Sequence, residues 1–594
     1  MPGRRSQSRR IARALVALVA AATLPSASLL AQAAPPACPA GVNRVGAVSG
    51  RRISAVTIAP RGLARLPGAL GASLHVTTRE ATIRNRLLFA AGDSVDTLRV
   101  AESVRQLRRL RYLSGAVVTA ACDTGGSVVL TVATRDAWSM KPRLSGGGSA
   151  GAVVGLEESN VLGTGRAVRV YARSDRGQFV VGAGYGDPTL FGGRVFGTVS
   201  HDAYRNGGAW NAALRTKEVG VFERWGVGLT ARQSARQSVA IQGVAPGDTV
   251  HRASAALLVR RRLTFAPVAA TFLLAGVDAE RTVLVAGADL PLAGPSAVRR
   301  TFAGLDLGLG RRTGRYDDVP WLLPQAGDDA ARFAPAEIPV GVEGEAVVSA
   351  GRDFATQMPM ARIDVWAGQV WHVGESVGAG PVNSADETPR ALLSSDVWAS
   401  GYRSLGTGGG KWSAGALRGS LALLTPATRG LWSARLSAER LVDPDPDVRS
   451  LTMADPAGRA LPRGSRLAET AVSASLDRTI HFTAPRRGYV LDGAVFGAGS
   501  VRWDGASPQS AAGRLASDRG VTLEVPESAG SERLYVGSLG VGLRLTPTRF
   551  GRATIGLDVG FPVLRSPQVA RRPYVGVSIT PPFGAGRRRD GSVQ

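Results

Sequence analysis

The stretch Arg463–Phe583 is a succession of short segments in which apolar and polar residues alternate. In the segment ATIGLDVGF, for example, the apolar residues Ile555 and Leu557 alternate with Gly556 and Asp558. Successive side chains of a strand point to opposite faces, so each segment predicts a strand with one apolar and one polar face. No helical pattern separates these strands. The pattern therefore predicts a sheet that closes on itself, with an apolar outer surface and a wet interior, as in a β-barrel that spans a membrane.

Composition agrees with a barrel and argues against a nucleic-acid-binding protein. The chain has 594 residues, 75 of them glycine, and only 6% are aromatic. Abundant glycine suits many turns and small lumen-facing positions. The formal charge of +26 comes from arginines spread along the whole chain, with no compact basic face and no recognition motif. We therefore assign this charge to a polar lumen and to loops that face lipopolysaccharide.

The N-terminus predicts export from the cytoplasm. Four arginines precede the apolar run Ala14–Leu24, and Ala31-Gln32-Ala33 follows, so residues 1–33 are expected to be a cleaved signal peptide. Residues 34–52 form a linker, and no later segment is apolar and long enough for a transmembrane helix. This combination predicts the bacterial outer membrane. Pro36-Ala37 is unlike a lipidation signal, so we expect Cys38 to form a periplasmic disulfide with Cys122 rather than to carry lipid.

Residues 53–136 have the character of a small α+β domain. The predicted order is strand, helix, helix, strand, strand, with a first helix opened by a capping box of Thr77 and Glu80. A second helix is predicted from about Asp96 to Tyr112, and the strands Gly115–Cys122 and Ser127–Asp136 follow it. This domain is expected to lie in the periplasm.

Residues 138–583 are predicted to form the barrel, and residues 584–594 a polar tail. In the segment LWSARLSAERL, Arg435 and Glu439 alternate with apolar residues, and such charges fit a lumen better than lipid, where a midplane arginine costs roughly 2–4 kcal/mol. The tryptophans, among them Trp366 and Trp398, are expected to form an interfacial girdle.

Two parts of the chain resemble known families. The 53–136 segment, with FAAGDSVDTLRVAESVRQLRRLRYL at its centre, resembles a polypeptide-transport-associated (POTRA) domain. The run TRDAW, LEESNVLGTG and GYGDPTLFGGR is similar to the start of the barrel in the bacterial surface antigen family, the BamA/TamA type of outer-membrane assembly factor. The resemblance implies a barrel of about sixteen strands and a role in inserting or translocating proteins at the outer membrane.

The resemblance also implies site residues. The second domain strand, about Ala116–Ala121, would be a sheet edge that pairs with extended client segments. Arg463 and Gly464 match the family's lumen-loop motif, although Ser465 replaces its aromatic residue and Gly497 stands where its aspartate is expected. Arg463 would then pair with Asp477 or Asp558. An ordinary surface turn is the alternative for this Pro-Arg-Gly-Ser sequence.

The barrel is expected to close between its first strand, about Ser139–Gly147, and its last, Pro573–Phe583. Proline and glycine near both strands would weaken this lateral seam, so that a client strand can pair with the freed edge. Expected partners are outer-membrane lipids or lipopolysaccharide, unfolded outer-membrane or secreted proteins, and accessory periplasmic proteins. The alternative is a passive channel or surface protein that has the fold alone.

We find no sequence evidence for an enzyme, a cofactor or a metal site. Gly147-Gly148-Ser149-Ala150-Gly151 has the form of a hydrolase motif, but it lies in a predicted turn between strands rather than between a strand and a helix. The five histidines are scattered without metal-ligand spacing. An outer-membrane hydrolase is the remote alternative, and it would depend on Ser149 or a histidine.

Overall fold

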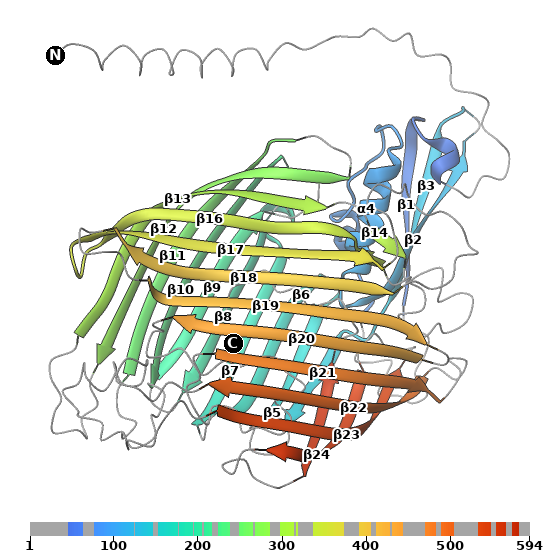
Figure 1. The fold of residues 1–594 in the computed structure, drawn as a ribbon. Helices are drawn as coiled ribbons and strands as arrows, with labels where there is room; N and C mark the ends of the chain where they lie inside the picture. Colours follow the sequence, from blue (N-terminus) through green and yellow to red (C-terminus); the bar gives the residue numbers. More distant parts are fainter. Residues whose placement is uncertain are drawn as a thin grey trace, which may run out of the picture.

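The computed structural model describes residues 45–62, 76–123, 125–146, 152–175, 178–193, 195–204, 207–216, 222, 224–237, 249–264, 268–285, 297–313, 316–318, 337–373, 391–405, 412–427, 430–442, 470–482, 489–503, 533–547, 554–565 and 573–580. A small α+β domain lies at one end of a large β-barrel (Figure 1). The predicted signal peptide, most of the linker and the polar tail lie outside these residues. In the described part of the chain no helix is long and apolar enough to cross a membrane.

The small domain follows the predicted element order. Its elements are the 3-10 turn η1 (Val45–Val48), strand β1 (Ile53–Arg61), helices α3 (Glu80–Arg84) and α4 (Thr97–Arg108), and strands β2 (Leu113–Cys122) and β3 (Val128–Asp136). The sheet order is β1-β3-β2, with β1 parallel and β2 antiparallel to β3. Leu107 of α4 and Ile83 of α3 are fully buried against the apolar face of this sheet.

The caps of the two helices differ from each other. Asp96 caps α4, because its carboxylate accepts hydrogen bonds from the backbone N–H groups of Leu98 and Arg99. The predicted capping box of Thr77 is wrong: α3 begins at Glu80, and its N-cap residue Arg79 makes no side-chain cap bond. The approach to α3 is fixed instead by Asp136 of β3, which accepts a hydrogen bond from the Thr78 N–H at 2.9 Å.

Twenty strands form the closed barrel within the described residues, so the expected count of about sixteen is wrong. Every neighbouring pair is antiparallel. Weakly patterned strands such as β9 (Gly207–Thr216), with small residues on both faces, explain why alternation alone does not give the count. In ring order from the first, the strands are β4 Met140–Gly146, β5 Ala152–Val161, β6 Arg166–Asp175, β7 Gln178–Thr189, β8 Val195–Tyr204, β9, β10 Trp225–Gln237, β11 Thr249–Arg262, β12 Ala269–Val285, β13 Ala297–Thr313, β16 Gly341–Asp353, β17 Met358–His372, β18 Leu392–Ser404, β19 Trp412–Ala427, β20 Gly430–Val442, β21 Thr470–His481, β22 Tyr489–Trp503, β23 Arg533–Pro547, β24 Thr554–Arg565 and β25 Tyr574–Thr580.

Three short elements lie on the turns of the barrel. Helix α5 (Leu190–Gly193) follows β7. Strands β14 (Tyr316–Asp318) and β15 (Glu337–Pro339) pair with each other between β13 and β16 and form a separate hairpin outside the wall.

The two faces of the wall alternate as predicted. On β13, Leu305 and Leu307 are 69% and 61% exposed, whereas Asp306 between them is 7% exposed. An apolar outer face and a polar inner face are what a barrel that spans a membrane requires. The tryptophan girdle is partly wrong: Trp366 and Trp398 are directly opposite each other and share the inner face of Arg362 and Asp364, because residues two apart on a strand point the same way.

Candidate functional site

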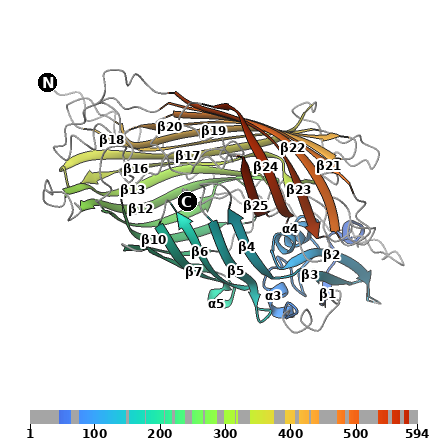
Figure 2. The same cartoon turned by 90° about the horizontal axis from the view of Figure 1, so that it is seen from below.

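The first and last barrel strands meet at the shortest ladder among the described residues of the wall. Within the described residues, strands β25 and β4 pair at Val577 with Gly146 and at Ser578 with Ser145 and nowhere else. Strand β4 makes seven such pairs with β5, and β25 makes seven with β24. Figure 2 shows this seam where the two sides of the barrel meet.

The short ladder makes the seam the weakest line in the barrel. An antiparallel ladder holds roughly one backbone hydrogen bond per residue pair, so the described part of the seam holds about two where its neighbours hold about seven. Along the described rest of β4, from Met140 to Leu144, no residue pairs with β25. Unpaired backbone groups cannot be satisfied by lipid, which makes this edge a place where another strand would be stabilised.

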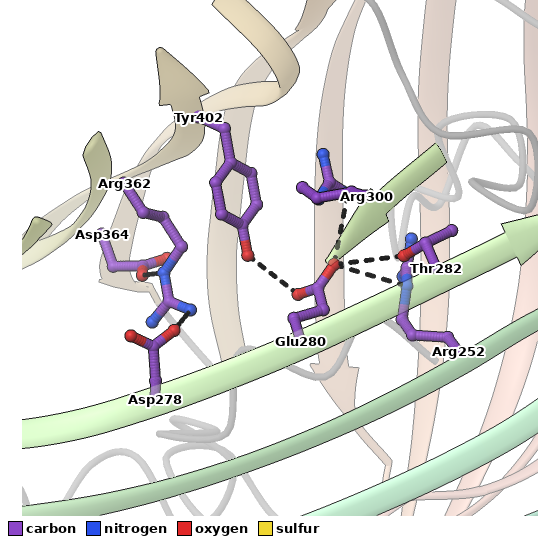
Figure 3. A network of polar contacts seen from close by, with 8 residues as sticks. All are labelled: Arg252, Asp278, Glu280, Thr282, Arg300, Arg362, Asp364 and Tyr402. Carbon is purple, nitrogen blue, oxygen red and sulfur yellow. Dashed lines mark hydrogen bonds and ion pairs between the residues drawn. The ribbon is translucent and has the colours of Figure 1, made fainter. Parts of the chain in front are cut away.

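A polar network joins five strands on the inner wall (Figure 3). The Glu280 carboxylate of β12 accepts a hydrogen bond from the Tyr402 hydroxyl at 2.9 Å and from Arg300 Nη2 at 3.2 Å. Arg252 Nε lies 3.8 Å from the same carboxylate. The guanidinium of Arg300 also lies over the Tyr402 ring, 4.2 Å from its centroid.

A second part of the network is centred on Arg362 of β17. Its guanidinium pairs with Asp278 of β12, and its Nε lies 2.6 Å from the carboxylate of Asp364 on its own strand. The Asp278 side chain is only 2% exposed. A buried carboxylate of this kind is stable only with its counter-charge in place.

The network also requires a tight bend in the wall. Strands β12 and β18 are four steps apart in the sheet, which is about 19 Å on a flat surface. The direct hydrogen bond between Glu280 and Tyr402 is therefore possible only where the sheet curves sharply. The bend at β12–β18 lies about half the ring from the seam. The barrel thus combines a cross-linked wall on one side with a short ladder on the other.

The predicted seam residues are only partly described. Ser139 precedes β4 and is buried, and its carbonyl accepts hydrogen bonds from the N–H and the hydroxyl of Ser159 on β5. Pro573 precedes β25 and is exposed. Gly147 and Phe583 lie outside the described residues, as does Ser149 of the apparent hydrolase motif.

The lumen-loop residues Arg463 and Gly464 also lie outside the described residues. Their two suggested partners are on the inner face: Asp477 lies on β21, opposite Phe496, and Asp558 is buried on β24. Asp558 already pairs with Arg544, at 2.5 Å from its Nη1. Whether either carboxylate pairs with Arg463 stays a prediction.

Residue Gly497 cannot stand in for an inward-facing aspartate. It lies opposite Leu539, and a Cβ at Gly497 would be 3.2 Å from the Leu539 side chain on the outer face. The inward carboxylate of β22 is Asp492, which is 2.7 Å from His481 Nδ1. The alternation within β22 already separates Asp492 from Gly497, so this correction was accessible from the sequence.

The predicted client edge is an edge of the small sheet. Strand β2 pairs with β3 on one side, and no described strand pairs with its other side. Ala116 is buried and Ala121 exposed. The Arg108 side chain of α4 donates a hydrogen bond to the Ala116 carbonyl at 3.0 Å and so occupies one end of the edge. Cys122 at the other end is disulfide-bonded, and Cys38 lies outside the described residues.

The described residues contain no group of three or more histidine, cysteine or acidic side chains arranged to hold a metal ion. The inner-wall network was missed by sequence reasoning. Alternation places Asp278 and Glu280 on the polar face of β12, but their partners are 84 and 122 residues further along the chain. Only the curvature of the closed wall brings them together.

Comparisons with known proteins give matches among solved structures only: no family model and no curated protein matches the chain. CdiB from Escherichia coli is 11% identical, with 90% of this chain and 77% of that chain covered and a TM-score of 0.40. CdiB from Acinetobacter baumannii is 12% identical, with 89% and 74% covered and a TM-score of 0.37. BamA from Haemophilus ducreyi lacking POTRA domains 1–3 is 13% identical, with 89% and 85% covered and a TM-score of 0.33.

Proposed function

We propose that this chain is an outer-membrane barrel of the BamA/TamA type that inserts or translocates proteins by opening laterally between β25 and β4. The single observation that carries the proposal is that the described residues form a ladder of two residue pairs at this seam, against seven on either side. An apolar outer face supports the membrane location, with lipids or lipopolysaccharide as neighbours.

The seam offers a client strand partners for its backbone hydrogen bonds, which lipid does not. Opening it breaks about two ladder hydrogen bonds, and a client strand that pairs with the freed edge of β4 replaces them and adds more. The polar inner face keeps an extended client hydrated on its way. The cross-linked wall opposite confines the opening to the seam, because five strands there are joined by side chains as well as by their backbones.

The small domain is proposed to act as a POTRA-like receiver in the periplasm. Its β2 edge has the geometry for adding an extended segment of an unfolded client. Arg108 must leave the Ala116 carbonyl for a client to use the full length of the edge. Accessory periplasmic proteins would bind on the same side of the membrane. We assign no catalytic role to the chain.

Locking the seam tests the proposal. Ser145→Cys with Ser578→Cys places two thiols at directly opposite positions, whose spacing suits a disulfide. The matched control is Ser437→Cys with Ser473→Cys, an opposite serine pair in the long ladder between β20 and β21. Under oxidising conditions the seam lock is expected to deplete barrel or secreted proteins in an outer-membrane proteome, and reductant restores them. The control is expected to leave the proteome unchanged.

An unchanged proteome with the seam oxidised overturns the lateral opening. If depletion of the whole protein also leaves the proteome unchanged but alters the uptake of small solutes, the chain is a passive channel instead. The two experiments together separate a wrong mechanism from a wrong function.

A further inference from the structure

The small domain is held to the barrel at two separate places. The first is the turn between β5 and β6. There the Gly163 carbonyl accepts hydrogen bonds from the Arg79 N–H and from the Thr82 hydroxyl, both at 3.0 Å. Asn160 Nδ2 donates to the Thr78 hydroxyl at 2.9 Å. These contacts lie beside the covalent connection into β4, so they fix the domain near the seam.

The second place is Tyr316, the first residue of β14. Arg109, the C-cap residue of α4, donates a hydrogen bond from Nη2 to the Tyr316 hydroxyl at 2.5 Å. The guanidinium carbons of Arg105 and Arg109 lie 4.5 and 5.0 Å from the centre of the same ring. Figure 1 shows β14 beside α4 at the end of the barrel that carries the small domain. One aromatic side chain thus contacts two arginines at the C-terminal end of α4.

The two places are far apart on the rim. Counted from β4, the turn of the first contact joins the second and third strands, whereas the β14–β15 hairpin joins the tenth and eleventh of twenty. The small domain therefore bridges the mouth of the barrel from the seam side to the wall opposite. The seam side is held further by Arg111, which reaches the Glu157 carboxylate on the inner face of β5 at 2.9 Å.

The second contact holds Arg109 through an aromatic ring and its hydroxyl, with the carboxylates of Glu102 and Glu343 close enough to act on its charge. The pKa of Arg109 lies above its ordinary value: burial lowers it, but Tyr316 and Glu102 raise it by more. Arg109 therefore stays protonated. Arg105 has a carboxylate partner, Glu102 at 2.9 Å, which keeps its guanidinium beside the ring. A cation over an aromatic face is attracted to it, and the hydroxyl adds one charge-assisted hydrogen bond.

The hairpin that carries Tyr316 is itself fixed to the wall. Its two strands pair over three residue positions, and the Thr313 hydroxyl at the end of β13 donates to the Val340 carbonyl at 3.0 Å, just before β16. The contact thus joins α4 to the cross-linked wall rather than to a separate loop.

From this arrangement we propose that Tyr316, Arg105 and Arg109 form a latch that holds the small domain across the mouth of the barrel. Its release lets the domain turn about the β5–β6 contact and opens the lumen on that side. This inference concerns the full chain in a membrane and does not rest on the insertion of client proteins. The latch depends on one barrel side chain, Tyr316. The first contact combines backbone and side-chain hydrogen bonds beside the covalent connection into β4, so the latch is the end that releases.

Substitutions at Tyr316 test the latch in the purified full chain, reconstituted in bilayers. Tyr316→Ala removes the ring and the hydroxyl, and Tyr316→Phe removes only the hydroxyl. Tyr316→Ala is expected to raise the open fraction in single-channel recordings about tenfold or more, the effect of losing two cation–π contacts and one hydrogen bond. Tyr316→Phe is expected to lie between Tyr316→Ala and the unaltered chain. Tyr185→Ala, on the outer face of β7, is the control and is expected to leave the open fraction unchanged.

A distance measurement separates release of the domain from damage to the barrel. Spin labels at Leu98→Cys on α4 and Phe354→Cys after β16, both on exposed residues, report the position of the domain. Tyr316→Ala and Arg109→Gln are each expected to broaden the distance distribution, and the two together no further than either alone. An unchanged distance and conductance in Tyr316→Ala overturns the latch. A broadened distance without a rise in conductance overturns the closure of the mouth.

Discussion

Replacing Arg362 with methionine tests whether the inner-wall network holds the barrel together. The change leaves the Asp278 carboxylate, 2% exposed, without its partner, and removes a second pair with Asp364. Asp364 is 37% exposed, so its pair contributes at most about 1 kcal/mol. Breaking a buried pair by removing one partner costs about 3–5 kcal/mol, because the remaining charge stays buried. We therefore expect Arg362→Met to lower the free energy of unfolding by about 3–5 kcal/mol.

The compensating change distinguishes an ion pair from packing. In the double variant Arg362→Met with Asp278→Asn no uncompensated buried charge remains, and the free energy of unfolding is expected to return to within about 1 kcal/mol of the unaltered chain. Guanidinium unfolding in lipid vesicles, followed by tryptophan fluorescence, measures both values. Arg281→Met is the matched control, since Arg281 is exposed on the outer face of β12. The reasoning is refuted if Arg362→Met costs less than about 1 kcal/mol, or if Asp278→Asn fails to restore stability.

Two further changes probe the small domain and the wall near the seam. Burial raises the pKa of Tyr112 to about 12, so its contribution to stability is complete below pH 10, its ordinary pKa, and is lost as the pH rises to 12. Between pH 9 and pH 11.5 this loss is about 2 kcal/mol. Tyr112→Phe is expected to abolish it, as measured by circular dichroism of the full chain during unfolding at these two pH values. An equal loss in Tyr112→Phe would assign it to another group. At Gly540, an added Cβ would lie 2.2 Å from the Phe496 ring and 2.5 Å from the Val559 carbonyl oxygen. Gly540→Ala is expected to cost about 1–3 kcal/mol in the same vesicle assay, whereas Gly228→Ala, with open space around it, is expected to be neutral. Equal stabilities of these two variants would contradict the packing of Phe496.

Prediction from the sequence succeeded where the physics is local. In β24, Ile555 and Leu557 are exposed on the outer face, and Asp558 is buried on the inner face, as alternation required. The order of elements in the small domain followed from helical spacing around Val100 and Leu107, both buried in α4. Alternation also predicts two orientations that were overlooked. Trp366 is four positions from Arg362 and therefore faces inward with it, whereas Gly497 is five positions from Asp492 and therefore faces outward.

Other features depend on residues that the sequence separates widely. The number of strands follows from how weakly patterned segments such as β9 pair with their neighbours, and a resemblance to a sixteen-stranded family gave too few. Arg362 and Asp278 are 84 residues apart, and Arg109 and Tyr316 are 207 apart. Loop closure over such lengths leaves no periodic trace in the sequence, so neither contact was predicted.

The sequence by itself determined which side of each strand meets lipid and which meets water. That choice is made residue by residue, because transfer of an apolar or charged side chain depends little on what lies far away in the chain. The tertiary structure alone decided where the ring closes with a two-pair ladder, where it bends enough to join Glu280 to Tyr402, and where the small domain reaches Tyr316. The first two features arise from closing one continuous sheet, in which the register of every strand constrains the meeting of the first strand with the last. The third depends on a hairpin outside that sheet, which meets the small domain only in the folded chain.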